Sequence, residues 1–334
     1  MKKGRPSIID VARRAGVSSA TVSHVINGSR KVCPATRARV EEAIAALDYR
    51  VNVLARNLRV GQSRVIAFVV ASLTTDFFLA VARGIESELS EQDWQLVLVN
   101  SNEQVQTEQR QIRFLRDQLI AGLIIVPTTD DHRYLEEILP SEVPLVFVDR
   151  QPSMVRGDSV VSTNREGAYE GISHLIRSGH RKIGIIVSFL GISTTDERLT
   201  GYREALRDHG IPKNERYITY GTGTPESGYA FTGHLLNNTD ITALFITNDL
   251  MTTGGYRYII EHRISVPDRL AVIAFDDGVW ATMASPRLSV IAQQTEELGR
   301  TAATLMLERI ATGGQAPPYR HVRIPTRMIL RESC

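Results

Sequence analysis

Polar side chains stand at the ends of several apolar runs of the chain, where a β-strand would finish. Asp149 ends one run, Asn248 ends another and Asp276 ends a third, while Arg198 opens a helical stretch in the segment DERLTGY. A carboxylate accepts hydrogen bonds from hydroxyl groups, and a guanidinium group donates two in parallel. These residue types predict a site for a small ligand rich in hydroxyl groups, with a sugar or a sugar acid as the first expectation.

Aromatic side chains could complete this ligand site. Phe77 and Phe78 open an expected helix, where their rings could cover the apolar face of a sugar, although Phe78 could equally belong to the core. Trp280 could stack on the ligand or simply pack against the protein. Aspartates at strand ends also cap helices, and this structural alternative applies most strongly to Asp249 and Asp277.

The same residues match no catalytic pattern that we could identify. The chain has no Gly-x-x-x-x-Gly-Lys-Ser/Thr phosphate loop, no Gly-x-Ser-x-Gly elbow and no paired metal-binding histidines. Asp276 and Asp277 are adjacent, so they are poorly placed to face each other as an acid and base pair. We therefore expect a protein that is not an enzyme, with no catalytic residue, no metal and no cofactor.

A sugar-binding protein without a regulatory role is an alternative, but it would need an export signal. The start MKKGRPSIID has lysines but no apolar core behind them, and no apolar run reaches about 18 residues. The two cysteines, Cys33 and Cys334, lack metal-ligand spacing. We therefore expect a cytoplasmic protein that does not interact with a membrane.

A second group of side chains, near the N-terminus, suits nucleic acid. Its members are small or polar and occupy the expected exposed face of one short helix: Ser18, Ser19, Ala20, Thr21, Ser23 and His24. Small side chains let a helix lie deep in the DNA major groove, where hydroxyls contact phosphates and polar groups contact base edges. Ser7 and Asn27, at the two ends of the segment, are further candidate DNA contacts.

The segment SIIDVARRAGVSSATVSHVIN, residues 7–27, supplies the elements that position these side chains. Ser7 with Asp10 three residues later predicts a capping box at a helix start. Gly16 breaks the apolar pattern where a tight turn needs a positive φ, and Val22 faces the first helix from the second. This is the layout of a helix-turn-helix, whose second helix enters the major groove. An ordinary helical hairpin in a core is the alternative.

The charge distribution favours the DNA interpretation. Residues 1–64 carry 13 Lys or Arg and 4 Asp or Glu, a net charge of +9, whereas the rest of the chain carries a net charge of −7. A basic segment on an acidic body indicates nucleic-acid binding at one end. Docking on an anionic membrane is the alternative, but the segment lacks the amphipathic aromatic face that this requires.

From Arg64 onward, apolar runs alternate with amphipathic stretches, which predicts strands alternating with helices. The expected strands are 65–70, 96–100, 122–127, 144–149, 182–188, 217–220, 243–249, 270–277, 288–293, 320–324 and 327–331. Continuous apolar strands between helices imply parallel sheets covered on both faces. Two such series imply two lobes with a cleft, and ligands of such sheets lie beyond the carboxyl ends of the strands.

Two N-terminal motifs make the chain resemble a known family. DVARRAGVSSATVSHVING followed by TRARVEEAIAALDY is similar to the lactose and galactose repressor (LacI/GalR) family of bacterial transcription regulators. The resemblance implies a third headpiece helix at about 35–47. Two residues depart from the family pattern: Cys33 stands where the family usually has a capping Ser, and Val51 stands where it usually has a Pro just before Asn52.

The resemblance also assigns a role to the linker YRVNVLARNLR. In the family this segment forms a hinge helix when a dimer binds DNA, and a leucine from each chain wedges into the minor groove. The matching residue is Leu58, and Asn52, Ala55 and Arg56 would lie beside it against the DNA.

In the body the resemblance implies a periplasmic-binding-protein-like fold whose late segments cross back between the lobes. The residues that match the family's effector site are Phe77, Phe78, Asp149, Arg198, Asn248 and Asp276. Arg198 belongs to an Arg-x-x-Gly-Phe/Tyr motif that continues with Gly201 and Tyr202. Thr75 and Asp76 stand where many relatives have Asn-Pro, so the ligand of a relative cannot be assigned directly to this chain.

These expectations combine into one domain organisation. The fold class is an N-terminal all-α helix-turn-helix headpiece plus an α/β two-lobed periplasmic-binding-protein-like effector domain. The headpiece is 1–49, the hinge helix or linker is 50–61, and the effector-binding and dimerisation domain is 62–334. Within that domain, the ranges are about 62–162 and 293–323 for lobe 1, and about 163–292 and 324–334 for lobe 2.

The expected function is that of a sequence-specific DNA-binding transcriptional regulator, in the first instance a repressor, controlled by a small metabolite. A homodimer would read a near-palindromic double-stranded operator, with Ser19, Ala20 and His24 at bases and Thr21 and Ser23 at phosphates. A sugar or sugar acid is the favoured effector, and a purine or nucleoside is the alternative. A dimer is expected rather than a tetramer, because no leucine heptads follow the last strand.

Overall fold

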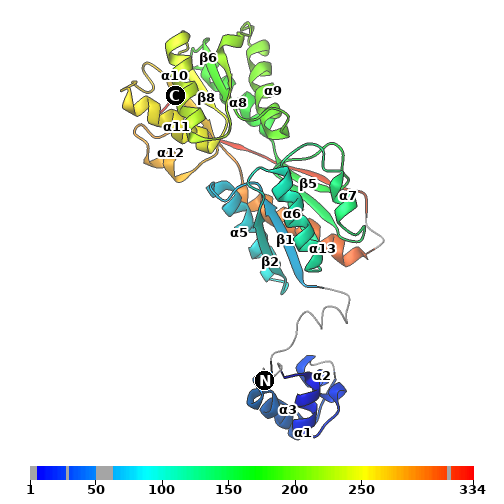
Figure 1. The fold of residues 1–334 in the computed structure, drawn as a ribbon. Coiled ribbons are helices and arrows are strands. Elements are labelled where there is room, and N and C mark those ends of the chain that lie inside the picture. The colour runs from blue at the N-terminus through cyan, green and yellow to red at the C-terminus, as the bar shows by residue number, and fades with distance from the viewer. Residues whose placement is uncertain (1–5, 28–29, 50–62, 314–316) are drawn as a thin grey trace. The chain divides into compact units, whose positions relative to one another are not determined.

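The chain divides into two compact units, residues 1–63 and residues 64–334. Three short helices form the N-terminal unit over the residues that the structure describes. The computed structural model describes residues 6–27, 30–49, 63–313 and 317–334. The helices are α1 (Ile8–Ala15), α2 (Ser19–Asn27) and α3 (Pro34–Ala46), drawn in blue in Figure 1. Val11, Val22 and Val40, one from each helix, are fully buried and centre their small core.

The predicted start and end of the first helix are confirmed. The Ser7 N–H donates to Asp10 Oδ2 over 2.9 Å, and the Asp10 N–H donates to Ser7 Oγ over 3.4 Å, which completes the capping box. Gly16 ends α1 with φ +64°, a left-handed conformation that glycine adopts without steric cost. Cys33 stands before α3 and makes no side-chain cap hydrogen bond, as expected for a poor capping residue.

Two six-stranded sheets form the second unit. The first has the order β11-β5-β4-β3-β1-β2 with parallel pairing throughout. Its strands are β1 (Val65–Val70), β2 (Gln95–Asn100), β3 (Gly122–Ile125), β4 (Leu145–Val148), β5 (Asp158–Ser162) and β11 (His321–Ile324). The expected α/β body with two series of strands is confirmed.

The second sheet has the order β12-β10-β9-β8-β6-β7, in which β12 pairs antiparallel with β10 and the other pairs are parallel. Its strands are β6 (Ile183–Val187), β7 (Ile218–Tyr220), β8 (Ala243–Ile246), β9 (Ala271–Phe275), β10 (Ser289–Ala292) and β12 (Arg327–Ile329). A 3-10 helix, η1 (Glu215–Tyr217), precedes β7. The late strands β11 and β12 therefore belong to different sheets.

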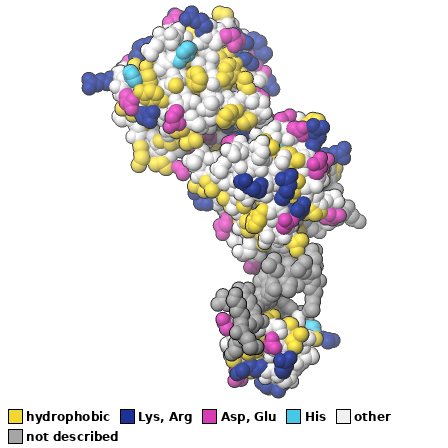
Figure 2. Space-filling view, in the orientation of Figure 1, with side chains coloured by type: hydrophobic (Ala, Val, Ile, Leu, Met, Phe, Trp, Pro, Cys, Tyr) yellow, Lys and Arg dark blue, Asp and Glu magenta, His cyan; other side chains and the backbone are white. Residues whose placement is uncertain are grey.

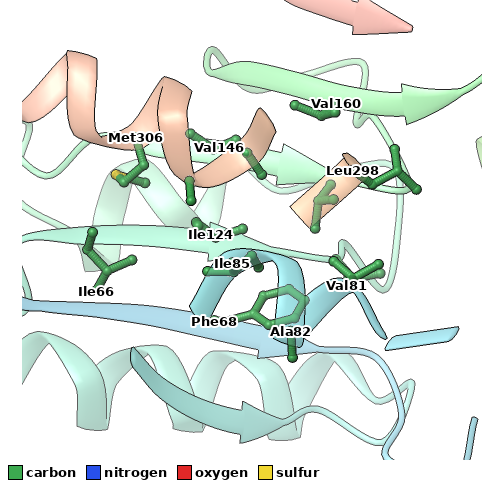
Figure 3. Close-up of a cluster of buried hydrophobic side chains, with 14 of the residues drawn as sticks. Ile66, Phe68, Val81, Ala82, Ile85, Ile124, Val146, Val160, Leu298 and Met306 are labelled. Carbon is green, nitrogen blue, oxygen red and sulfur yellow. The ribbon is translucent and has the colours of Figure 1, made fainter. Parts of the chain in front are cut away.

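Helices cover both faces of the first sheet. One face carries α5 (Asp76–Ser90) and α13 (Thr295–Thr312), and the other carries α6 (Val105–Asp117) and α7 (Tyr134–Ile138). Side chains alternate along β1, since Phe68 packs toward α5 and α13 while Val69 packs toward α6 and α7. Figure 3 shows the first of these clusters, with Leu298 and Met306 of α13 close to the strands.

The second sheet is covered in the same way. On one face lie α8 (Asn164–Arg177) and α9 (Ser193–Asp208), and on the other lie α10 (Pro225–Asn238), α11 (Asp249–Glu261) and α12 (Val279–Met283). Figure 1 shows these helices around the sheet in green, yellow and orange. Each lobe of the second unit therefore has a sheet between two helix layers.

A pair of glycines fixes α13 against α5. A Cβ added to Gly84 would lie 2.2 Å from the Glu296 carbonyl oxygen, and one added to Gly299 would lie 2.1 Å from the Val81 carbonyl oxygen. Backbone atoms cannot move aside as side chains do, so both positions need glycine. This contact holds the late helix α13 in the first lobe.

Three elements of the structure were not expected from the sequence: β5, α12 and η1, which precedes β7. Strand β5 consists of the residues DSVVS, whose apolar run is too short to stand out although all five residues are buried. Helix α12 has five residues and follows the Asp276–Asp277 pair closely. The strand expected at 144–149 ends at Val148, because Asp149 turns into a left-handed conformation with φ +68°.

Figure 2 shows basic and acidic side chains interspersed over the visible face of the second unit. Across the described ranges, no helix is both long enough and apolar enough to cross a membrane.

Candidate functional site

A cavity of about 360 Å³ lies at the carboxyl ends of strands from both sheets. It is lined by six of the seven residues expected to contact the effector: Phe77, Phe78, Asp149, Arg198, Asn248 and Asp276. Asp249 also lines it, whereas Trp280 does not. Residues that are up to about 200 positions apart in the chain thus meet around one space, as parallel sheets with aligned carboxyl ends require.

Arg198 is the most firmly held of these side chains. It is only 7% exposed. Its Nε donates to Asn164 Oδ1 over 2.8 Å, and its Nη1 donates to the Thr247 carbonyl oxygen over 2.6 Å. The guanidinium carbon lies 3.7 Å from the centre of the Phe275 ring. Burial lowers the pKa of Arg198, while Asp276 and Asp149 oppose that effect. The group is preorganised to donate hydrogen bonds in a fixed direction.

The rest of the Arg198 motif explains its spacing. Gly201 lies one turn later on α9, and a Cβ there would come within 2.2 Å of the Arg165 carbonyl oxygen on α8. Tyr202 is fully buried, and its hydroxyl donates to the Ile183 carbonyl oxygen over 2.8 Å. The glycine and the tyrosine therefore fix α9 against α8 and the sheet, and so fix Arg198 in the cavity.

Strained backbone is concentrated at this cavity. Eight non-glycine residues in the described part of the chain have positive φ. Four of them come just after helices and are ordinary helix ends: Asp48, Asp93, Leu119 and Arg263. The other four all line the cavity: Asn102 (+54°), Glu103 (+55°), Asp149 (+68°) and Asp276 (+77°). Such strain gathers at functional sites, because stability alone does not favour it.

The cavity holds more carboxylates than guanidinium groups. Burial raises the pKa of Asp149 to about 6, although Arg150 and Arg198 oppose the shift. Burial, followed by the charge of Asp276, raises the pKa of Asp249 to about 7. Burial also raises the pKa of Asp276, against the effect of Arg198. A further negative charge would therefore be poorly tolerated here.

The polar pairs that follow β8 and β9, Asn248–Asp249 and Asp276–Asp277, include side chains with different contacts. Asn248 caps α11, since its Oδ1 accepts from the Met251 N–H over 3.0 Å, and it also lines the cavity. Asp277 instead pairs with Arg331, with Nη1–Oδ1 and Nη2–Oδ2 distances of 2.8 and 2.9 Å. Asp277 is therefore held in an ion pair and caps none of the described helices, whereas Asn248 both caps α11 and lines the cavity.

Of the three aromatic candidates, Phe77 and Phe78 line the cavity and Trp280 does not. The Phe77 and Phe78 rings meet edge to face with centres 5.1 Å apart, and Phe78 is both a core residue and a lining residue. Of the two alternatives for Trp280, the structure has packing: its half-buried ring packs on the second sheet's core and does not line the cavity. A Cβ added to Gly278 would lie 2.1 Å from Trp280 Nε1, so the ring folds back over that glycine.

Sequence reasoning missed several lining residues. Arg150 follows Asp149 and could have been suspected from that position alone, and Gln293 donates to Asp276 Oδ1 over 2.6 Å. Hydroxyl side chains add to the lining: Ser72, Thr74, Thr75, Ser188, Thr194, Thr195, Thr222, Thr224 and Thr247. Within the described ranges, no group of three or more His, Cys, Asp or Glu could hold a metal ion. The lining suits a polar organic ligand.

The candidate DNA-reading helix is α2. Ser18, Ser19 and Ala20 are exposed, while Thr21, Ser23 and His24 are half-buried. Ser18 Oγ accepts from the Thr21 N–H over 3.1 Å, so Ser18 caps the helix.

The remaining DNA candidates lie at the edges of this unit. Ser7 is exposed, and its side chain takes part in the capping box of α1. Asn27 is the last residue of α2. Asn52, Ala55, Arg56 and Leu58 lie outside the described residues.

Comparisons with family models match two parts of the chain. Residues 7–52 match the family model of bacterial regulatory proteins, lacI family. Residues 172–334 match the model of a periplasmic binding protein-like domain. The first match spans the three N-terminal helices, and the second begins within α8 and continues to the end of the chain.

Full-length relatives and solved structures are also similar to the chain. It is 32% identical over 332 residues to the ribose operon repressor of Haemophilus influenzae, covering 97% of each chain. It is 31% identical over 306 residues to the transcriptional repressor PurR of Aliivibrio salmonicida, covering 91% of this chain and 92% of that one. The structure of the lac repressor dimer bound to operator and the anti-inducer ONPF matches with a TM-score of 0.87, 28% identity and 98% coverage of each chain.

Proposed function

The chain belongs to the lacI family of bacterial regulatory proteins, and from this premise we propose how it recognises its effector. It is a DNA-binding transcriptional regulator with an effector-binding body. We propose that its effector is a neutral monosaccharide, with a pentose such as ribose as the first candidate, bound in the 360 Å³ cavity. The relative named as a ribose operon repressor supports this choice.

One observation carries the proposal: guanidinium donors and carboxylate acceptors face the same buried space. Arg198 would donate to adjacent hydroxyls, while Asp149 and Asp276 would accept from them. Phe77 would cover an apolar face of the sugar ring. Hydroxyl groups can donate and accept, so a sugar satisfies both kinds of partner.

The charge balance narrows the ligand class to a neutral sugar. Four carboxyl groups line the cavity, Glu103, Asp149, Asp249 and Asp276, against the guanidinium groups of Arg150 and Arg198. A sugar acid or a sugar phosphate would add negative charge to a set whose pKa values are already raised. We therefore favour neutral sugars over the acids that the sequence left open.

For DNA binding we propose a homodimeric repressor on a near-palindromic operator. Ser19, Ala20 and His24 would read bases from the major groove, and Leu58 of each chain would wedge at the centre. The effector would shift the balance between two arrangements of the body. A near-complete shift needs a preference of about 5.5 kcal/mol for one of them.

A thermal-shift panel on the full chain tests the effector class. The panel contains D-ribose, other neutral sugars, sugar acids, sugar phosphates and purine bases. A ligand at 100 times its dissociation constant adds about 2.7 kcal/mol, which moves the midpoint by a few degrees.

We expect neutral sugars to raise the midpoint and Asp276→Asn to remove the rise. The PurR relative makes a purine the competing class. A rise with purines alone would replace the sugar proposal, and a rise with sugar acids alone would refute the charge argument.

A further inference from the structure

The turn after β2 is strained in an unusual way. Asn102 and Glu103 are consecutive, and both have left-handed backbone conformations, with φ +54° and +55°. Asparagine tolerates this conformation better than most residues, but glutamate gains nothing from it. Glycine would relieve the strain at either position, so the glutamate side chain itself needs an explanation.

Hydrogen bonds hold the turn against the end of β1. The Ser101 N–H donates to the Val70 carbonyl oxygen, and the Glu103 N–H donates to the Ala71 carbonyl oxygen, both over 2.9 Å. Asn100 and Asn102 are joined by two hydrogen bonds of 2.6 and 3.0 Å. The strained conformation is therefore imposed by several independent contacts.

The turn presents the Glu103 carboxylate to Arg150. Glu103 Oε1 accepts from Arg150 Nη2 over 2.7 Å, and Oε2 accepts from Nη1 over 2.8 Å. Nη1 also donates to the Pro127 carbonyl oxygen over 3.0 Å. Both residues line the cavity, and the Arg150 side chain is only 12% exposed. Two parallel hydrogen bonds fix the plane of the guanidinium group.

Arg150 has a competing partner in the same cavity. Its Nε is buried without a hydrogen-bond partner in the described structure and lies 3.5 Å from Asp149 Oδ2. Without Glu103, we expect the guanidinium group to turn toward Asp149 and to occupy the oxygens proposed for the effector. Glu103 holds Nη1 and Nη2 turned away from Asp149, while Nε stays at ion-pair distance from it.

We propose that Glu103 is a positioning residue for effector binding, and that the strained turn serves to hold it against Arg150. The inference rests on the proposed function, because it concerns the same cavity. Glu103 acts through Arg150, which in turn leaves Asp149 open to ligand hydroxyls.

A double-mutant cycle on the full chain tests this role, with D-ribose affinity measured by isothermal titration calorimetry. We expect Glu103→Gln to weaken binding about tenfold. Arg150→Gln removes the group that would block Asp149, so the double variant should match Arg150→Gln within twofold and bind ribose more tightly than Glu103→Gln does. Losses that multiply, or a Glu103→Gln affinity within twofold of the wild type, would overturn the proposal.

A matched control separates positioning from loss of an ion pair. Glu204 accepts two hydrogen bonds from Arg165, of 2.6 and 2.7 Å, and neither residue lines the cavity. Glu204→Gln removes a similar pair and should leave ribose affinity unchanged. A loss equal to that of Glu103→Gln would show a general structural effect and contradict the proposal.

A measurement without ligand distinguishes this inference from the proposed function. Phenylglyoxal modifies accessible arginines, and peptide mapping gives the rate at Arg150. We expect a severalfold faster rate in Glu103→Gln than in the wild type, and no change at Arg150 in Glu204→Gln. If wild-type protein binds no ribose, the effector proposal fails, and this rate alone decides whether Glu103 holds Arg150. An unchanged rate refutes the inference.

Discussion

The buried carboxyl group of Asp149, a proposed ligand contact, lowers the free energy of unfolding when it is ionised. The residue is 6% exposed, and burial raises the pKa of its carboxyl group from 3.8 to about 6. Below about pH 4 the group is protonated in both the folded and the unfolded chain. Between about pH 4 and pH 6 the unfolded chain ionises first, so the free energy of unfolding falls by about 3 kcal/mol and then stays low.

Replacing Asp149 with Asn should therefore stabilise the protein at high pH only. We expect the free energy of unfolding of Asp149→Asn to exceed that of the wild type at pH 8, by up to about 3 kcal/mol, and to approach it at pH 4. Urea unfolding of both proteins at the two pH values measures this difference. Sugar binding should weaken in the same variant, because a hydrogen-bond acceptor is lost.

An exposed aspartate provides the control for this prediction. Hydrogen bonds from Arg133 lower the pKa of Asp131 to about 2, so its shift has the opposite sign. Asp131→Asn should not stabilise the protein at pH 8. If Asp149→Asn also gave no gain at pH 8, burial would not be the cause of the shift.

At the scale of elements, glycine contacts decide where the site side chains lie. Gly201→Ala would place a Cβ 2.2 Å from the Arg165 carbonyl oxygen, so α8 and α9 would have to separate. Overpacking of this kind costs about 1–3 kcal/mol. We expect lower stability together with weaker sugar binding, because Arg198 lies one turn earlier on α9. Chemical unfolding and calorimetry measure the two effects.

Thr200→Ala serves as the control on the same helix. Thr200 is exposed, and its hydroxyl donates to the Asp196 carbonyl oxygen within α9. Its replacement should change stability by about 0.5 kcal/mol or less and leave binding intact. Equal losses in both variants would contradict the packing explanation.

The elements were largely predictable, because apolar periodicity and capping residues are local signals. Ser7, Asp10 and Gly16 specify α1 through contacts within ten residues. Strand β5 was missed because DSVVS contains only two consecutive apolar residues, and its burial comes from neighbours elsewhere in the chain. Local patterns cannot report burial that depends on distant segments.

The cavity was predictable to the extent that strand ends identify it. Asp149, Asn248 and Asp276 could be placed there because parallel strands end at one edge. Neither the Glu103–Arg150 hydrogen bonds nor the contact of Trp280 with Gly278 could be predicted. The first depends on the positive φ of Glu103, and the second on the space left by the missing Cβ of Gly278.

At the scale of the whole molecule, a wedge from the linker would join DNA binding to the body. Leu58→Ala should weaken binding to the operator more than binding to unrelated DNA, because wedging is possible only where the central step unstacks. Fluorescence anisotropy with both DNAs at one salt concentration measures the two affinities. An equal loss on both DNAs would refute the wedge.

We propose that sugar in the cavity controls operator binding. The most direct test is the affinity of the full chain for its operator, selected in vitro from random DNA, with and without saturating D-ribose. We predict at least a tenfold change in wild-type affinity, and no change in Asp276→Asn, which keeps the shape of the side chain but removes its charge. The ligand-free affinities of the two proteins should agree. An equal ribose response in both proteins, or none in the wild type, would contradict the account.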